Sequence, residues 1–179
     1  VVYPLFETAI RHSRGESVAE HRNRIGTLWA GFNAVAVENP HAAVRTPMTA
    51  TEITTPSKDN RMVAAPYTKA MMANNSVDQA SAVLIVSAAR AAALGVPRDR
   101  WVFPLVGTRA DDEASPGVRH DLHRSPAARS AGSLVFELAG TDMDEVNHLD
   151  IYACFPASVQ VCALELGLDL DSPSDRPLT

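Results

Sequence analysis

The chain has 179 residues, a formal net charge of −5 and 46% hydrophobic residues, which is enough apolar material for a buried core. Phosphate binding requires lysine and arginine clustered on one face, so the negative charge argues against a nucleic-acid partner. No apolar run approaches the roughly 20 residues that span a bilayer, and the N-terminus lacks a signal-peptide pattern. We therefore expect no membrane span and a cytoplasmic location. The chain starts in an apolar run without methionine, and we expect both ends to be cuts.

Residues 1–40 are predicted to be helical after the first few positions. Ser17 and Glu20 form a Ser-x-x-Glu capping box, and Asn39-Pro40 stops the pattern that follows it. The apolar residues between them recur at helical spacing: Ile25, Leu28, Trp29, Phe32, Val35 and Ala36. This face is predicted to lie in the core.

From Pro40 to Asn75 the periodicity fades and turn-forming residues dominate. Apolar residues such as Met48, Ile53 and Tyr67 are interspersed among them, which indicates a packed irregular segment. Loops of this length inside compact proteins are usually functional or disordered.

Two apolar runs follow, and both are predicted to be strands. The run at 80–87 is typical of a strand buried on both faces of an α/β sheet. Ser87 then caps a short alanine-rich helix that ends at Gly95. The second run, at 101–106, contains Pro104, which suggests an edge strand or a bulge.

The last third predicts a helix, a strand and a second helix. Ser125-Pro126 gives an N-cap and a first-turn proline, and Gly140 is the expected end of that helix. A strand is expected at 146–152, followed by a helix from Pro156 to Gly167. With the strand at 101–106 these elements would form a β-α-β-α unit.

Cys154 lies where the expected strand at 146–152 meets the next helix. The first N–H groups of a helix favour negative charge, so a thiol there ionises more readily than a free one. A small buried residue in a tight turn is the alternative reading. Cys162, the second of two cysteines, would be about 12 Å away along the helix, beyond disulfide reach. No histidine spacing indicates a metal site.

Three stretches together resemble the middle of a thiolase-superfamily enzyme. They are Asn39 to Arg45, Asn75 to Ala80 running into the predicted strand, and Asp150-Ile151-Tyr152-Ala153-Cys154-Phe155. The order of the stretches is most similar to sterol-carrier-protein-type thiolases and to thiolase-like acetyl-CoA acetyltransferases. Those thiolases have His-Asp-Cys-Phe where this chain has Tyr152-Ala153-Cys154-Phe155, so the last two residues match and the first two depart.

The resemblance implies a layered thiolase-like α/β fold, in which an irregular loop domain precedes the β-α-β-α unit. Residues 1–79 would be the loop domain that holds coenzyme A. Residues 80–100 would be the last strand and linker of the first thiolase half, and 101–179 the start of the second half. The intact protein would act in lipid metabolism and be a homo-oligomer.

The resemblance also implies roles for individual residues. Cys154 would be the acid/base that moves the α-proton of an acyl-CoA substrate, and Tyr152 could donate a hydrogen bond to the thioester oxygen. Asn75, Ser76 and Lys69 are candidates for contacts to coenzyme A, although turn capping and solvent exposure are the alternative interpretations. No covalently bound cofactor and no metal are expected.

The implied activity is acyl transfer by thioester exchange or Claisen condensation and cleavage. The family's nucleophilic cysteine precedes the matching region and its catalytic histidine follows it, so we expect this chain alone to be catalytically silent. Tyr152 and Ala153 leave two alternatives open. One is a non-catalytic thiolase-like protein that binds acyl-CoA or a partner, and the other is a thiolase-fold aldolase. A self-standing α/β binding domain unrelated to coenzyme A is a third and weaker hypothesis.

Overall fold

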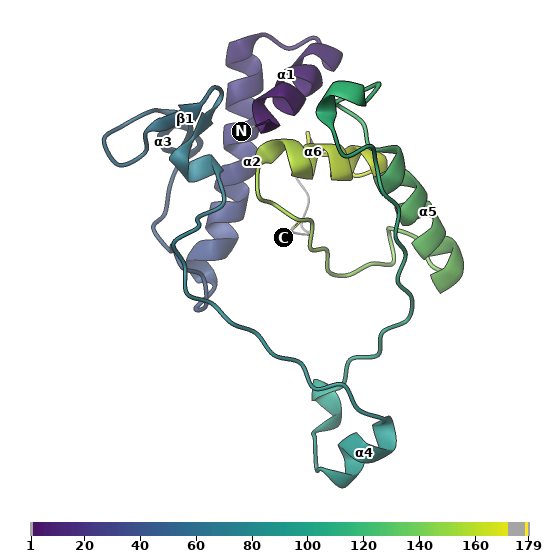
Figure 1. The fold of residues 1–179 in the computed structure, drawn as a ribbon. Coiled ribbons are helices and arrows are strands. Elements are labelled where there is room, and N and C mark those ends of the chain that lie inside the picture. The colour runs from purple at the N-terminus through teal and green to yellow at the C-terminus, as the bar shows by residue number, and fades with distance from the viewer. Residues whose placement is uncertain (1, 172–177, 179) are drawn as a thin grey trace.

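The computed structural model of the chain describes residues 2–171 and 178. Helix α6 occupies the middle of the fold, and α1 and α5 both pack against it (Figure 1). In chain order the elements are α1 (Tyr3–Ser13), α2 (Val18–Glu38), α3 (Ala50–Thr54), β1 (Met62–Ala64), β2 (Tyr67–Thr68), the 3-10 turn η1 (Lys69–Met71), α4 (Ala88–Ala93), η2 (Arg98–Arg100), η3 (Pro116–Val118), α5 (Pro126–Ala139) and α6 (Pro156–Glu165).

The helix ends follow the capping residues of the sequence. Ser17 accepts a hydrogen bond from the backbone of Glu20 at 3.2 Å, and the Glu20 carboxylate accepts one from Ser17 N–H at 2.8 Å, which completes the predicted capping box. Ser125 caps α5, and Gly140 ends it with φ of 64°, in the left-handed region that glycine adopts without strain. The predicted helices of the last third are therefore confirmed.

The segment predicted to be irregular contains short elements that pack on α2. Thr49 and Glu52 form a second capping box at the start of α3, and β1 and β2 form an antiparallel pair. The buried Asn60 joins these parts, since its amide donates to Ile53 O at 3.0 Å and its side-chain oxygen accepts from Ala70 N–H at 2.8 Å. The packed irregular segment that the interspersed apolar residues predict is therefore confirmed.

Helices α2 and α3 approach so closely at Gly26 that no side chain fits there. A Cβ on Gly26 would lie 2.5 Å from Thr54 Cγ2 and 3.1 Å from the Ala50 carbonyl oxygen. We expect Gly26→Ala to lower the free energy of unfolding by about 1–3 kcal/mol, because the two helices must separate. Gly31→Ala in the same helix meets nothing within 4 Å and should raise it by about 0.5–1 kcal/mol. Urea unfolding followed by circular dichroism measures both. Equal effects at the two positions would contradict the close packing.

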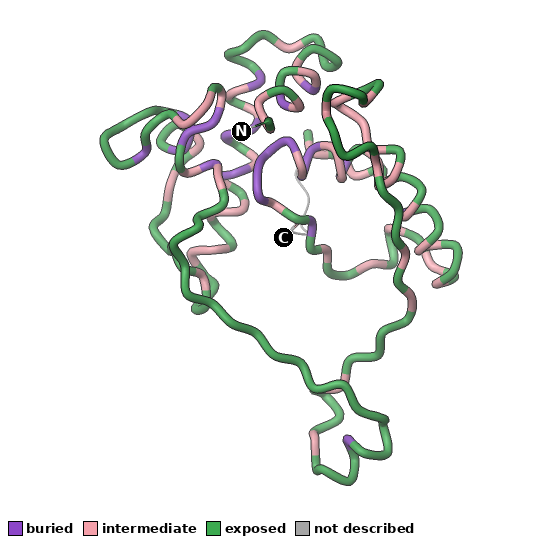
Figure 2. The backbone as a smooth tube through the Cα atoms, viewed as in Figure 1, coloured by how far each residue is buried: buried purple, intermediate pink, exposed green. Residues whose placement is uncertain are grey.

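The hydrophobic core gathers around Phe155, at the start of α6. The Phe155 ring stacks on Tyr3 with a centroid distance of 3.8 Å and tilts against Tyr67 at 5.5 Å. Buried residues from α2, α3, η1, α6 and the segment before α6 complete the cluster: Ile25, Trp29, Ile53, Met71, Ile151, Cys154 and Val159. Figure 2 shows this burial at the start of α6 and in the segments beside it. The apolar face predicted for α2 is confirmed at Ile25 and Trp29.

The strands predicted at 80–87, 101–106 and 146–152 are not formed. Residues 80–86 and 101–106 run as extended segments on either side of α4 and η2, away from the core (Figures 1 and 2). Val83 is 86% exposed and Val102 is 89% exposed, which contradicts burial on both faces of a sheet. In the segment at 146–152, Ile151 is buried, but none of these residues forms part of a strand. The prediction of a β-α-β-α unit is therefore confirmed for its two helices and wrong for its two strands.

The reason is that a strand needs a second strand beside it to satisfy its backbone hydrogen bonds. In the described part of the chain, the pair β1 and β2 makes up the sheet. An apolar run predicts how a strand would be buried but does not supply its neighbour. The division into domains at residues 79 and 100 remains a prediction.

Candidate functional site

Cys154 lies immediately before Phe155, the N-cap residue of α6. Cys154 is only 7% exposed. The sulfur lies 3.8 Å from the Tyr3 hydroxyl oxygen and 3.7 Å from Ser158 Oγ. The expected position at the start of a helix is confirmed, although an extended segment and not a strand leads into it. We name Cys154, Tyr3, Ser158 and Tyr152 the thiol cluster.

Backbone contacts from three parts of the chain fix the turn that carries this thiol. Ala73 N–H donates to the Cys154 carbonyl oxygen at 3.1 Å, and Ile151 N–H donates to Leu178 O at 2.8 Å. The Ser158 hydroxyl lies 2.9 Å from Tyr152 O and 2.8 Å from Phe155 O. Since the hydroxyl hydrogen is directed to these carbonyl groups, Ser158 Oγ is left to accept a hydrogen bond from the thiol.

The hydroxyl groups of two tyrosines interact with the sulfur. The pKa of Tyr3 is raised, first by its hydrogen bond with Cys154 and then by burial. The pKa of Tyr152 is also raised, first by the electrostatic interaction with Cys154 and then by a side-chain hydrogen bond with it. Both phenols therefore keep their protons at neutral pH and can donate to a thiolate at Cys154.

The structure brings together the two residues predicted to be catalytic. Tyr152 is 75% exposed, and its side chain still interacts with the Cys154 sulfur. It thus lies on the solvent side of the thiol, where a ligand could reach it. The roles of acid/base and hydrogen-bond donor remain predictions.

The residues predicted to contact coenzyme A lie on the exposed segment that follows the hairpin. Asn75 and Ser76 come shortly after Ala73, whose backbone is bonded to Cys154, so this segment begins beside the thiol. Ser76 N–H donates to the Asn74 side chain at 3.0 Å, which is turn capping. Lys69 is exposed in η1. Their binding role remains a prediction.

Two members of the thiol cluster escaped the sequence analysis. Ser158 follows Cys154 by four positions, and that spacing on a helix would have pointed to it. Tyr3 carries no such signal, because 151 positions separate it from Cys154 in the sequence. Only the packing of α1 against α6 brings its hydroxyl to the sulfur.

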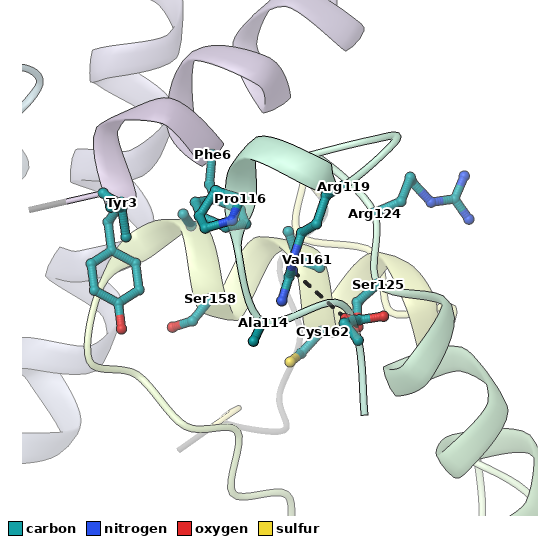
Figure 3. Close-up of a pocket in the computed structure, with 13 residues that line it drawn as sticks. Tyr3, Phe6, Ala114, Pro116, Arg119, Arg124, Ser125, Ser158, Val161 and Cys162 are labelled. Atoms are coloured by element: carbon teal, nitrogen blue, oxygen red, sulfur yellow. Dashed lines mark hydrogen bonds and ion pairs between the residues drawn. The ribbon is translucent and has the colours of Figure 1, made fainter. Parts of the chain in front are cut away.

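Cys162 takes no part in the thiol cluster. Both cysteines are free thiols, as their expected separation on the helix predicts. Cys162 is half-buried, and burial, followed by the charges of Cys154 and Glu165, raises its pKa. It lines a cavity of about 330 Å³ between α1, α6 and the loop before α5 (Figure 3).

The described residues 2–171 and 178 contain no cluster of three or more histidine, cysteine or carboxylate side chains that could hold a metal ion. In the same part of the chain, no helix has the length and apolar character that crossing a membrane requires.

A scan against protein-family models finds no match for this chain, and a search of curated proteins finds none either. Among solved structures, the chain is similar to the crystal structure of a monomeric SCP2-thiolase-like protein type 1 from Mycobacterium smegmatis. The two share 31% sequence identity with a TM-score of 0.78 over 97% of this chain. The chain spans 38% of the length of that structure's chain.

The match extends over nearly the whole of this chain, and its 31% identity shows a likeness in sequence as well as in fold. The predicted resemblance is confirmed: this is a thiolase-like α/β chain, related to the SCP2-thiolase type of the thiolase superfamily.

Proposed function

We propose that this chain is part of a CoA-dependent thiolase-like acyltransferase, in which Cys154 acts as the acid/base for the α-proton of an acyl-CoA. The observation that carries the proposal is the thiol at the start of α6, with the Tyr3 hydroxyl 3.8 Å from its sulfur. The likeness to an SCP2-thiolase-like protein supports it at the level of the family.

The proposed chemistry uses the donors around the sulfur. The Cys154 thiolate takes a proton from the α-carbon, and the electron pair of the broken C–H bond moves toward the thioester oxygen as an enolate. The phenol of Tyr3, 3.8 Å from the sulfur, is placed to donate a hydrogen bond to a thiolate at Cys154. Tyr152, exposed beside the sulfur, donates to the enolate oxygen. Acyl transfer also needs a nucleophile, which the family places outside the matched region.

The proposed position for coenzyme A is the segment from Lys69 to Ser76, which is exposed at Lys69 and from Ala73 onward. Its backbone at Ala73 is bonded to Cys154, which would bring a bound pantetheine chain to the thiol. Lys69 would meet a phosphate as a point charge, and Asn75 and Ser76 would offer hydrogen-bonding groups to the amides of pantetheine.

A non-catalytic protein that binds acyl-CoA is the second candidate. The observation in its favour is the burial of Cys154, whose sulfur has hydroxyl groups on two sides. Exchange of the α-protons of acetyl-CoA in D₂O separates the two: a base exchanges them, and a binding protein does not. The SCP2-thiolase-like neighbour is described as monomeric, which lends the expected homo-oligomer no support.

Protection of Cys154 from alkylation tests the proposal on this chain alone. In a Cys162→Ser variant, where Cys154 is the remaining thiol, acetyl-CoA should slow modification by iodoacetamide several-fold, because the thioester would cover the sulfur. Mass spectrometry after timed quenching gives the rate. Lys69→Glu should reduce the protection, whereas Lys58→Glu, on the exposed loop before β1, should leave it unchanged. Identical rates with and without acetyl-CoA would refute the proposed site.

A further inference from the structure

Tyr3 and Glu7 lie on the same face of α1. They are four positions apart, so Glu7 stands one helical turn after Tyr3, on the side that packs against α6. The Tyr3 ring stacks on Phe155 at 3.8 Å, and its hydroxyl oxygen lies 3.8 Å from the Cys154 sulfur, at the start of α6 (Figure 3). The Glu7 carboxylate accepts a hydrogen bond from Gln160, in the middle of α6, at 2.6 Å. Helix α1 is therefore held on α6 at two points.

The contact at Glu7 is polar and has a fixed direction. Glu7 is fully buried, and its carboxylate also accepts hydrogen bonds from His21 of α2 and from the Tyr67 hydroxyl of β2. The Tyr67 ring packs against Phe155 at 5.5 Å, so this side chain touches both points at which α1 is held. Hydrogen bonds have preferred distances and angles, whereas apolar contact is non-directional. The carboxylate thus fixes how α1 is placed on α6.

Gln160 is buried at a cost to stability. Only 5% of this residue is exposed, and within the part of the chain that the structure describes its side-chain oxygen Oε1 has no hydrogen-bond partner. A buried polar atom without a partner is destabilising, and an apolar side chain of similar length, such as that of methionine, avoids this cost. What the glutamine adds is the hydrogen bond to Glu7. This combination indicates a residue that specifies geometry at the expense of stability.

We propose that Glu7 and Gln160 are positioning residues for the thiol cluster. Their hydrogen bond sets α1 on α6 so that the Tyr3 hydroxyl stays within reach of the Cys154 sulfur. At a separation of 3.8 Å, a further displacement of about 1 Å carries the hydroxyl out of reach. The inference rests on the proposed function for the reaction that the thiol performs, but not for the reactivity of the thiol itself.

The experiment measures how strongly Tyr3 affects the alkylation of Cys154. All variants carry Cys162→Ser, so that iodoacetamide has one thiol to modify, and mass spectrometry gives the rate at neutral pH. Tyr3→Phe removes the hydroxyl and keeps the stacked ring. We expect it to slow alkylation by about three-fold or more, because the phenol is placed to donate to the thiolate that reacts.

Two variants then separate positioning from stability. Gln160→Met removes the hydrogen bond to Glu7 together with the unpartnered oxygen, so urea unfolding should show a chain at least as stable as before. In this variant Tyr3→Phe should no longer change the alkylation rate. Glu7→Gln keeps an oxygen that accepts from Gln160, and its amide can donate to the Tyr67 hydroxyl oxygen. It should therefore retain the effect of Tyr3→Phe.

Leu164→Met is the matched control, because Leu164 lies one turn after Gln160 on α6 and is exposed. It should also retain the effect of Tyr3→Phe. An effect that persists in Gln160→Met, or that is absent when Gln160 is present, would overturn the inference. A marked loss of stability in Gln160→Met would overturn it as well, since the hydrogen bond would then serve the fold.

Protection of Cys154 by acetyl-CoA, measured on the same samples, separates this inference from the proposed function. If the effect of Tyr3→Phe depends on Gln160 while acetyl-CoA gives no protection, the positioning role stands and the proposed function fails. If acetyl-CoA protects the thiol while the effect of Tyr3→Phe is the same with and without Gln160, the proposed function stands and the positioning role is overturned.

Discussion

Replacement of Glu7 by alanine is expected to lower the free energy of unfolding by roughly 3–5 kcal/mol, a large part of the 5–15 kcal/mol that stabilises an ordinary domain. Glu7 is fully buried in α1. Its carboxylate accepts hydrogen bonds from His21 Nε2 at 2.7 Å, from Gln160 Nε2 at 2.6 Å and from the Tyr67 hydroxyl. One side chain thus joins α1 to α2, to α6 and to β2.

Both ring nitrogens of His21 have partners. Nδ1 lies 2.7 Å from a Glu16 carboxylate oxygen and 3.1 Å from Arg24 Nη2, and Nε2 lies against Glu7. Loss of Glu7 would leave a buried imidazole nitrogen, a phenol and an amide without this partner, and such groups are costly to bury. The pKa of Tyr67 is raised, first by burial and then by the charge of Glu7, so its hydroxyl stays a donor.

Urea unfolding of Glu7→Ala, His21→Ala and the double variant measures this network. The double variant should lose less stability than the sum of the single variants, because each single change strands the partner that the other removes. Glu38→Ala, at the exposed end of α2, is the control and should change stability by less than about 0.5 kcal/mol. Strictly additive losses would mean that the two residues act separately, contrary to their direct contact at 2.7 Å.

Acid should unfold the protein between about pH 4.3 and pH 2, and two glutamates should account for much of this effect. Burial by itself would raise the pKa of Glu16, but hydrogen bonds from Arg24, Arg14 and His21 outweigh it and lower the pKa to about 2. The pKa of Glu165 is also lowered to about 2. The hydrogen bonds from Arg124 contribute most and outweigh burial, and those from Arg129 and the Ser125 N–H add to them.

The direction of the effect follows from the two protonation states. In the unfolded chain a glutamate has a pKa of about 4.3, so below that pH the unfolded state binds protons that the folded state does not. The stabilisation is complete above about pH 4.3 and is lost as the pH falls toward 2. Each group contributes on the order of 3 kcal/mol over this window.

Urea midpoints between pH 2 and pH 7 measure the acid sensitivity. Glu16→Gln and Glu165→Gln should each be less stable at neutral pH and should each flatten the slope below pH 4.3. Glu137→Gln, on the exposed face of α5, is the control and should keep the slope of the unmodified chain. A slope that survives both substitutions would assign the acid transition to other groups.

The helices were largely predictable because their signals are local. Ser17 with Glu20, and Ser125 with Pro126, fix helix starts through contacts within one turn. The position of Cys154 before a helix followed in the same way from Pro156 and the pattern after it. The family resemblance also depended on short stretches and their order, and the solved structure with 31% identity confirms it.

The predicted strands failed because pairing is not local. The runs at 80–87 and 101–106 have the composition of buried strands, yet they lie exposed in an extended excursion around α4. Two arginines of α2 also have partners that no local pattern predicts. Arg24 is mostly buried against Glu16, and Arg22 donates to Thr54 O. Such partners lie eight to thirty-two residues away along the chain.

The sequence by itself determined that a thiol stands at the start of a helix, within a chain of thiolase type. Tertiary structure alone decided what surrounds that thiol. Tyr3 reaches Cys154 because α1 packs on α6, and Ala73 reaches it because the hairpin packs on the core. These contacts depend on side chains far apart in the sequence that fill one space together, which no local pattern records. The donors of the thiol cluster and the apolar cavity beside it are consequences of that packing.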